Sequence, residues 1–121
     1  MATPLYQAKA EFFKTLGHPA RIRVLELLSQ GERSVGELLP DVGLEASHLS
    51  QQLRVLRQGG LVTARRQGSN VYYALAADDV AELLAVARRI LTGVLAGRIE
   101  TLQELRVPVR SRGASSRRIT R

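Results

Sequence analysis

Apolar side chains recur every three or four positions through most of the chain, which is the spacing of amphipathic helices. A first helix is predicted over residues 5–16, where the pattern stops at Gly17. Pro19 suits the first position of a second helix, because its missing N–H needs no partner there. That helix is expected to run to about Ser29, with apolar side chains on more than one side. It should therefore be buried on more than one side.

Residues 34–58 predict two helices joined by a tight turn. Residues 34–39 form a short amphipathic segment, and residues 40–44 contain a proline and a glycine that are expected to break it. A second helical pattern covers residues 45–58 and stops at two glycines, which are common just beyond a helix C-terminus. This is the order of a helix-turn-helix.

Two short strands are predicted after this pair of helices. Residues 61–66 and 71–76 are rich in strand-forming side chains. The four residues Gln67-Gly-Ser-Asn70 between them are typical of a hairpin turn. The tip of this hairpin should be basic, polar and exposed.

A final long helix is expected to begin at the Asp78-Asp79 pair, because Asp79 with Glu82 three residues on resembles a capping box. Apolar positions then continue without a proline as far as Pro108. Such a helix would be roughly 40 Å long at 1.5 Å per residue. It presents more apolar surface than this small body can cover, so a partner surface is needed. Its two glycines, Gly93 and Gly97, either admit a partner helix closely or are simply tolerated.

The chain has 121 residues and 45% apolar side chains, enough for one domain with a modest core. The predicted fold is mainly α with a small β-hairpin: a winged helix-turn-helix of about five helices and a two-stranded antiparallel wing. There is no cysteine, no apolar run long enough to span a bilayer, and no signal-peptide pattern at the start. We therefore expect a cytoplasmic protein without disulfides or thiolate metal sites.

The net charge of +7 is unevenly distributed. Residues 1–105 have a net charge of +1, whereas residues 106–121 hold six arginines and no acid. The predicted organisation is a folded DNA-binding and dimerisation domain over residues 1–106 and a basic tail over residues 107–121. The tail has almost nothing to bury and is expected to be disordered. Residues 43–73 contain four arginines and only one acidic residue, a glutamate, so the local charge favours an anionic partner.

The second helix of the pair should pack its leucines inward and present a polar face outward. Leu49, Leu53 and Leu56, with Ala46, form the inward face. Side chains on the other sides include hydroxyls, amides and arginine, which are suited to base edges and phosphates. The bland alternative is a solvated helix face. The predicted DNA-contacting residues of this helix are Ser47, His48, Ser50, Gln51, Gln52 and Arg54.

The hairpin that follows would then act as a wing that reaches the DNA backbone or minor groove. Its predicted contacts are Arg65, Arg66, Gln67, Ser69 and Asn70. An ordinary surface hairpin with solubilising arginines is the alternative. The polar helix immediately before it favours the wing.

Several ordered motifs resemble the ArsR/SmtB family of bacterial winged-helix repressors. They are Leu16-Gly-His-Pro-Ala-Arg-Ile-Arg-Val-Leu25, Val35-Gly-Glu-Leu38, Leu49-Ser-Gln-Gln-Leu-Arg-Val-Leu56, Gly60-Leu-Val62 and Arg66-Gln-Gly-Ser-Asn-Val-Tyr-Tyr73. The resemblance implies a homodimer built on the first and last helices. It also implies binding to an inverted repeat in a promoter, which blocks transcription.

The sequence departs from the family at its metal sites. Where many members have Cys-Val-Cys, this chain has Ser34, Val35 and Gly36, and it has no histidine after His48 to complete a site on the last helix. The carboxylates at Asp78, Asp79 and Glu82 make a poor transition-metal site without imidazole. His18 is expected to cap or pack before Pro19. We therefore predict no metal and no cofactor. In the predicted DNA-contacting helix, Gln52 stands where the family often has a histidine.

The favoured hypothesis is a sequence-specific dimeric repressor that lacks the family's metal site. One alternative is a repressor that responds to a metal or small molecule at a non-cysteine site, or to a partner protein. Others are a nonspecific architectural DNA binder that uses the arginine tail and an interaction module with a vestigial wing. An enzyme is least favoured, because no nucleophile with a base and an orienting group and no Gly-rich phosphate loop appear in the sequence.

Overall fold

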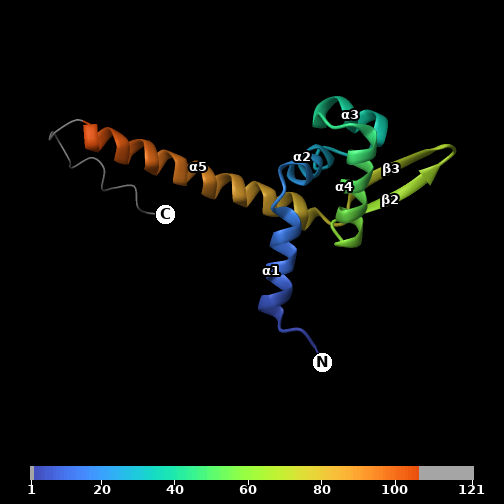
Figure 1. Ribbon diagram of the computed structural model, residues 1–121, viewed down its shortest axis with the longest axis horizontal. Coiled ribbons are helices and arrows are strands. Elements are labelled where there is room, and N and C mark those ends of the chain that lie inside the picture. The colour runs from blue at the N-terminus through green and yellow to red at the C-terminus, as the bar shows by residue number, and fades with distance from the viewer. Residues whose placement is uncertain (1, 107–121) are drawn as a thin grey trace. The chain divides into compact units, whose positions relative to one another are not determined.

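The computed structural model describes the backbone of residues 2–106 and the side chains of residues 2–103. The predicted tail, residues 107–121, lies outside this range. The elements, in chain order, are α1 (Leu5–Leu16), α2 (Pro19–Leu28), β1 (Arg33–Ser34), α3 (Val35–Val42), α4 (Ala46–Gln58), β2 (Val62–Gln67), β3 (Asn70–Leu75) and α5 (Asp78–Arg106) (Figure 1). The predicted winged helix-turn-helix is confirmed. None of the helices in the described range is long and apolar enough to cross a membrane.

The predicted hairpin gains a third strand in the structure. β2 and β3 pair in register from Val62 opposite Leu75 to Gln67 opposite Asn70, so that two residues form the turn. Gly68 in this turn has φ 65°, a left-handed conformation that glycine adopts without steric cost. β1 pairs with the other edge of β3, which gives the strand order β1-β3-β2. A two-residue strand has too little sequence to show a period, so it was not predicted.

Pro40 does not break α3, contrary to the prediction. The helix runs through it to Val42 and ends at Gly43, which has φ 78° and donates its N–H to the carbonyl of Leu39 at 3.3 Å. Proline removes one backbone hydrogen bond from a helix. Here that loss is offset by a capping box at Ser34 and by the complete burial of Leu38. The glycine, and not the proline, ends the helix.

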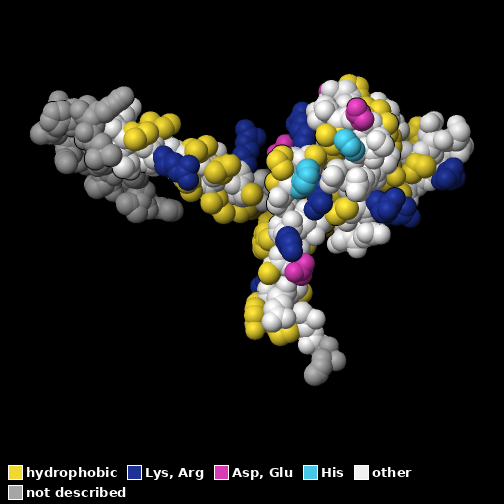
Figure 2. Space-filling view, viewed as in Figure 1, with side chains coloured by type: hydrophobic (Ala, Val, Ile, Leu, Met, Phe, Trp, Pro, Cys, Tyr) yellow, Lys and Arg dark blue, Asp and Glu magenta, His cyan; other side chains and the backbone are white. Residues whose placement is uncertain are grey.

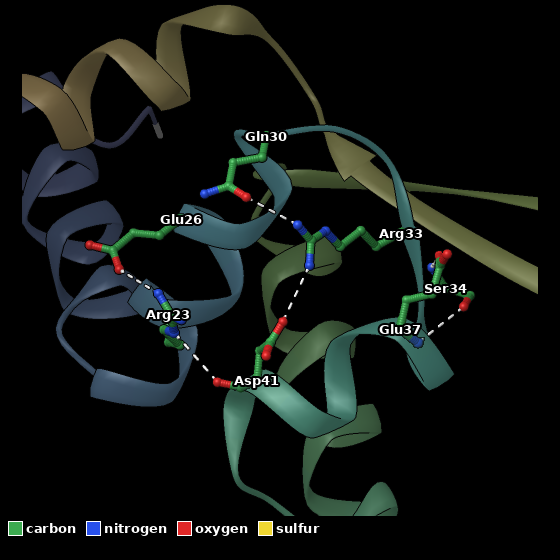
Figure 3. A network of polar contacts seen from close by, with 7 residues as sticks. All are labelled: Arg23, Glu26, Gln30, Arg33, Ser34, Glu37 and Asp41. Atoms are coloured by element: carbon green, nitrogen blue, oxygen red, sulfur yellow. Dashed lines mark hydrogen bonds and ion pairs between the residues drawn. The ribbon is translucent and has the colours of Figure 1, made fainter.

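A polar network ties α3 to α2 and β1, the two elements that precede it (Figure 3). Arg33, in β1, donates to the carboxylate of Asp41 at 3.5 Å and to the side-chain oxygen of Gln30 at 3.1 Å. Arg23 of α2 donates through Nε to the backbone carbonyl of Asp41 at 3.4 Å. These exposed contacts are individually weak, and their effect is to fix the end of α3 against α2 and β1.

Two local predictions around α4 and α5 were wrong. Ala46 is exposed, because it is the first residue of α4 and precedes the packed turns. α5 begins at the Asp78-Asp79 pair as predicted, but Asp79 lies inside the first turn and so does not occupy the capping position. Both acids still lie where the partial positive charge of a helix N-terminus favours them.

The hydrophobic core is made mainly of leucine and valine from α2, α3, α4 and β2. The described residues up to Leu84 form one compact unit that contains this core, and the described residues from Ala85 onward belong to a second unit. The first turns of α5 belong to the first unit, where Val80 is buried and Leu83 and Leu84 pack against the core. The largest fully buried side chains in the described range are Val24, Leu25, Leu38, Leu49, Leu53, Leu56 and Leu61.

The helix end at Gly43 gives a matched pair of substitutions. Gly43→Ala should lower the free energy of unfolding by about 1 kcal/mol, because its left-handed φ is strained for a residue with a Cβ. Gly36→Ala, inside the same helix, should raise it by up to about 1 kcal/mol, since a Cβ there meets only the Ser34 hydroxyl at 3.9 Å. Urea denaturation of both variants measures the difference. Equal effects of the two substitutions would contradict a helix end at Gly43.

Candidate nucleic-acid interface

The packing of α4 decides which of its side chains are available to a ligand. Leu49, Leu53 and Leu56 are fully buried along one side of the helix. Side chains on the other sides therefore point away from the core. The structure places five of the six predicted contact residues of α4 on the surface: Ser47, His48, Ser50, Gln51 and Arg54.

Gln52, the sixth predicted residue, has a different environment. It is half-buried, and its Oε1 accepts a hydrogen bond from Nε of Arg21 at 2.8 Å. The same guanidinium donates through a second nitrogen to the backbone carbonyl of Thr15 at 3.0 Å. Arg21 thus joins α4 to α2 and to the end of α1. Gln52 holds the helix in place, and sequence reasoning missed its partner because nothing in a helical pattern pairs residues 31 positions apart.

Two wing residues, Arg65 and Gln67, are linked in the structure. Both nitrogens on one edge of the Arg65 guanidinium donate to Glu32, at 3.0 and 2.6 Å, and the third donates to Oε1 of Gln67 at 2.6 Å. The guanidinium carbon also lies 5.1 Å from the ring centroid of Tyr72, the residue opposite Arg65 in the sheet. The hydrogen bond from Arg65 lowers the pKa of Glu32, and the same bond raises the pKa of Arg65. Both groups are therefore ionised at neutral pH.

The remaining wing residues, Arg66, Ser69 and Asn70, are exposed around the turn. Of the carboxylates in the described range, none lies within ion-pair distance of Arg66 or of Arg54 on α4. These two arginines are free to meet an external anion. Figure 2 shows Lys and Arg side chains at the hairpin.

The helix and the wing belong to the same compact unit and lie side by side (Figure 1). The short turn at Gly59-Gly60 leads from α4 directly into β2, and Leu61 is anchored in the core by backbone hydrogen bonds to Leu56 and Ala76. The arrangement is a polar helix face beside a hairpin that carries one paired and one unpaired arginine. Its chemistry is hydrogen bonding and charge, which suits a polyanion with readable edges.

Ser34, the first of the three positions that correspond to the family's cysteine metal site, caps the N-terminus of α3. The Ser34 hydroxyl accepts the N–H of Glu37 at 3.3 Å, and Glu37 accepts the N–H of Ser34 at 2.8 Å. The prediction that His18 caps its helix is confirmed, because its Nδ1 accepts the N–H of Ala20 at 3.1 Å. Within the described residues, no three His, Cys, Asp or Glu side chains come together as a metal site would require.

Comparison with known proteins places the chain in a family. The sequence profile described as "Bacterial regulatory protein, arsR family" matches residues 18–64, which include the helix pair and the start of the wing. An uncharacterized HTH-type transcriptional regulator of Mycobacterium tuberculosis, Rv0081, is 64% identical over 104 residues, which is 85% of this chain and 91% of the relative. The chain belongs to the ArsR family of bacterial regulatory proteins. It is a transcriptional regulator and not an enzyme, as the sequence indicated.

Solved structures agree with this assignment. The crystal structure of M. tuberculosis Rv0081 superposes with a TM-score of 0.76 at 65% identity, over 81% of this chain and 99% of that one. A homodimeric winged helix-turn-helix DNA-binding domain from Mycobacterium bovis, described as a possible ArsR-family regulator, gives a TM-score of 0.69 at 37% identity, over 75% of this chain and 84% of that one.

A further relative by sequence is a biofilm growth-associated repressor of Agrobacterium fabrum. It is 47% identical over 75 residues, which is 62% of this chain and 64% of the relative.

Proposed function

We propose that this protein is a homodimeric repressor that acts in the cytoplasm on an inverted repeat in a promoter. In this proposal α4 of each subunit enters a major groove and the wing contacts the adjacent backbone. The observation that supports it most directly is the division of α4 between three fully buried leucines and an exposed face of hydroxyl, amide and guanidinium groups. Binding of DNA to such dimers would exclude RNA polymerase from the promoter.

The side chains of α4 and the wing would have different roles. Gln51 can make paired hydrogen bonds to adenine and Arg54 to guanine, so both are assigned to base reading. Ser47, His48 and Ser50 would contact bases or phosphates near the start of the helix. Arg66 would contact a phosphate, because it is exposed at the wing and has no ion-pair partner among the described residues. Gln52 would act through Arg21 by holding the helix.

The homodimer is assigned to the first and last helices because both expose large apolar side chains (Figure 2). Uncovered apolar surface of this extent on a regulator favours a protein partner. The M. bovis relative is described as homodimeric, which supports a second copy of the chain as that partner. Apart from the helix's own backbone, a Cβ at Gly93 or Gly97 would meet no described atom within 4 Å, so both positions leave room for a close approach. The exposed residues are Leu5, Tyr6 and Phe13 in α1 and Ile90, Leu91, Val94, Leu95, Ile99 and Leu102 in α5.

Residues 1–106 would thus form the DNA-binding and dimerisation domain. For residues 107–121, which carry five of the arginines, we propose a sequence-independent contribution to DNA affinity. This assignment keeps operator preference within residues 1–106.

The division between base reading and phosphate contact can be tested by substitution. Gln51→Ala and Arg54→Ala should each cost about 1 to 3 kcal/mol on the operator and much less on random DNA, because each removes a contact to a base edge. Arg66→Ala should weaken binding to both DNAs alike and make the salt dependence shallower by about one phosphate contact. Fluorescence anisotropy over a salt series measures both quantities.

Arg89→Ala is the control for the loss of one positive charge, because this exposed arginine lies on α5, outside α4 and the wing. It should leave operator preference unchanged. Equal losses on operator and random DNA for all of the α4 and wing variants would contradict the assigned roles.

Dimerisation through α5 can be tested with two charges placed on different sides of the helix. Val94→Glu should raise the dimer dissociation constant by about 100-fold or more, because it would bury an unpaired charge in the interface. Ala96→Glu, two residues on and so about 200° around the helix, should have little effect. Sedimentation velocity gives the oligomeric state of each variant. A Val94→Glu variant that remains as dimeric as Ala96→Glu would remove α5 from the interface.

A further inference from the structure

The Arg65 guanidinium is bound to a carboxylate from another part of the chain. Glu32 lies in the loop before β1, 33 positions earlier, and holds the Nε edge of the guanidinium with two hydrogen bonds of 3.0 and 2.6 Å. This paired, fork-like geometry is the one in which arginine also binds a phosphate. The pair of nitrogens that would grip a DNA phosphate is therefore already occupied by an anion.

The contact is open to exchange with an external anion. The Arg65 side chain is 50% exposed and the Glu32 side chain 38% exposed, so water and ions reach both. Exposed ion pairs contribute little to stability, because each partner gives up favourable hydration and freedom of rotation. A phosphate in the strong field of a DNA backbone can therefore replace the carboxylate at small cost.

Arg65 has two further contacts that do not depend on Glu32. Gln67, two residues on along β2, accepts from the third guanidinium nitrogen at 2.6 Å. The ring of Tyr72, the cross-strand neighbour of Arg65, lies against the guanidinium, with its centroid 5.1 Å from the guanidinium carbon. Both contacts come from the hairpin itself. They keep the guanidinium oriented at the wing when the carboxylate leaves.

We propose that Glu32 is an intramolecular competitor of DNA: its carboxylate occupies the anion-binding edge of Arg65 in the free protein, and a backbone phosphate displaces it in the complex. This inference rests on the proposed DNA-binding function. It assigns to Glu32 the effect of lowering affinity for every DNA sequence. In the free protein the wing then presents the unpaired charge of Arg66 and a neutralised Arg65, which limits retention on random DNA.

The test measures the affinity of the full-length protein for operator and random DNA over a salt series. Glu32→Gln should bind both DNAs about fivefold more tightly, the order expected when an exposed ion pair no longer has to be broken. Its salt dependence should equal that of the wild type, because the same phosphate is contacted in the end. Arg65→Ala should make the logarithmic slope shallower by about 0.9, the value for one phosphate contact.

Two controls separate this exchange from a change in net charge or stability. Glu26→Gln removes the same charge from another exposed ion pair, that with Arg23, and should change affinity much less. In an Arg65→Ala background, Glu32→Gln should add no more than Glu26→Gln does. Thermal unfolding of each variant identifies any loss of folded protein.

The inference is overturned if Glu32→Gln weakens binding, which would make the ion pair a brace that DNA recognition needs. It is also overturned if Glu32→Gln and Glu26→Gln act alike, or if Arg65→Ala leaves the salt slope unchanged. In these cases the wild type still prefers its operator and the proposed function stands. A wild type without operator preference would instead refute the proposed function, and the competitor role with it.

Discussion

Burial of three leucines on one side of α4 is the constraint on which the rest of the molecule depends. Leu49, Leu53 and Leu56 have no exposed surface, and each lies three or four residues from the next. Rotation of α4 about its axis would expose these three leucine side chains to water. This would cost several kcal/mol, so the helix is held in one orientation. The packing therefore fixes which side chains of α4 face outward, Gln51 and Arg54 among them, before any ligand arrives.

Polar contacts around α4 add to the positioning of this helix. Arg21 reaches from α2 to Gln52 and to the end of α1, so it sets the position of α4 relative to the helix that precedes it. The wing is anchored to the core by the buried side chains of Leu61, just before β2, and Val62, the first residue of β2. Charge is distributed unequally on this scaffold, with Arg65 neutralised by Glu32 and Arg66 unpaired. The proposed interface thus combines a helix that packing holds rigidly with a wing on which one arginine is ion-paired and the other is not.

Regular periodicity allowed most of the fold to be predicted, and the errors lie where tertiary packing, very short elements or contacts between distant residues decide the structure. Both bounds of α1 were predicted, because the helical spacing of apolar residues begins at Leu5 and ends just before Gly17. Pro40 was misjudged because its cost is offset by the buried Leu38 and the capping box at Ser34, which are tertiary and side-chain effects. β1 is too short to have a period. Among the site residues, exposure of the polar face of α4 could be predicted from the leucine spacing. The hydrogen bond from Arg21 to Gln52 and the ion pair between Glu32 and Arg65 could not, because each joins residues more than thirty positions apart and no local pattern connects them.

The most direct test is hydroxyl-radical footprinting of the full-length protein on its operator, combined with the binding stoichiometry. We expect two chains per operator and two protected regions related by two-fold symmetry, with centres about 34 to 36 Å apart, so that each α4 occupies one of two successive major grooves. One chain bound to a single protected region, or protection that does not depend on sequence, would contradict the proposal that paired α4 helices read the DNA.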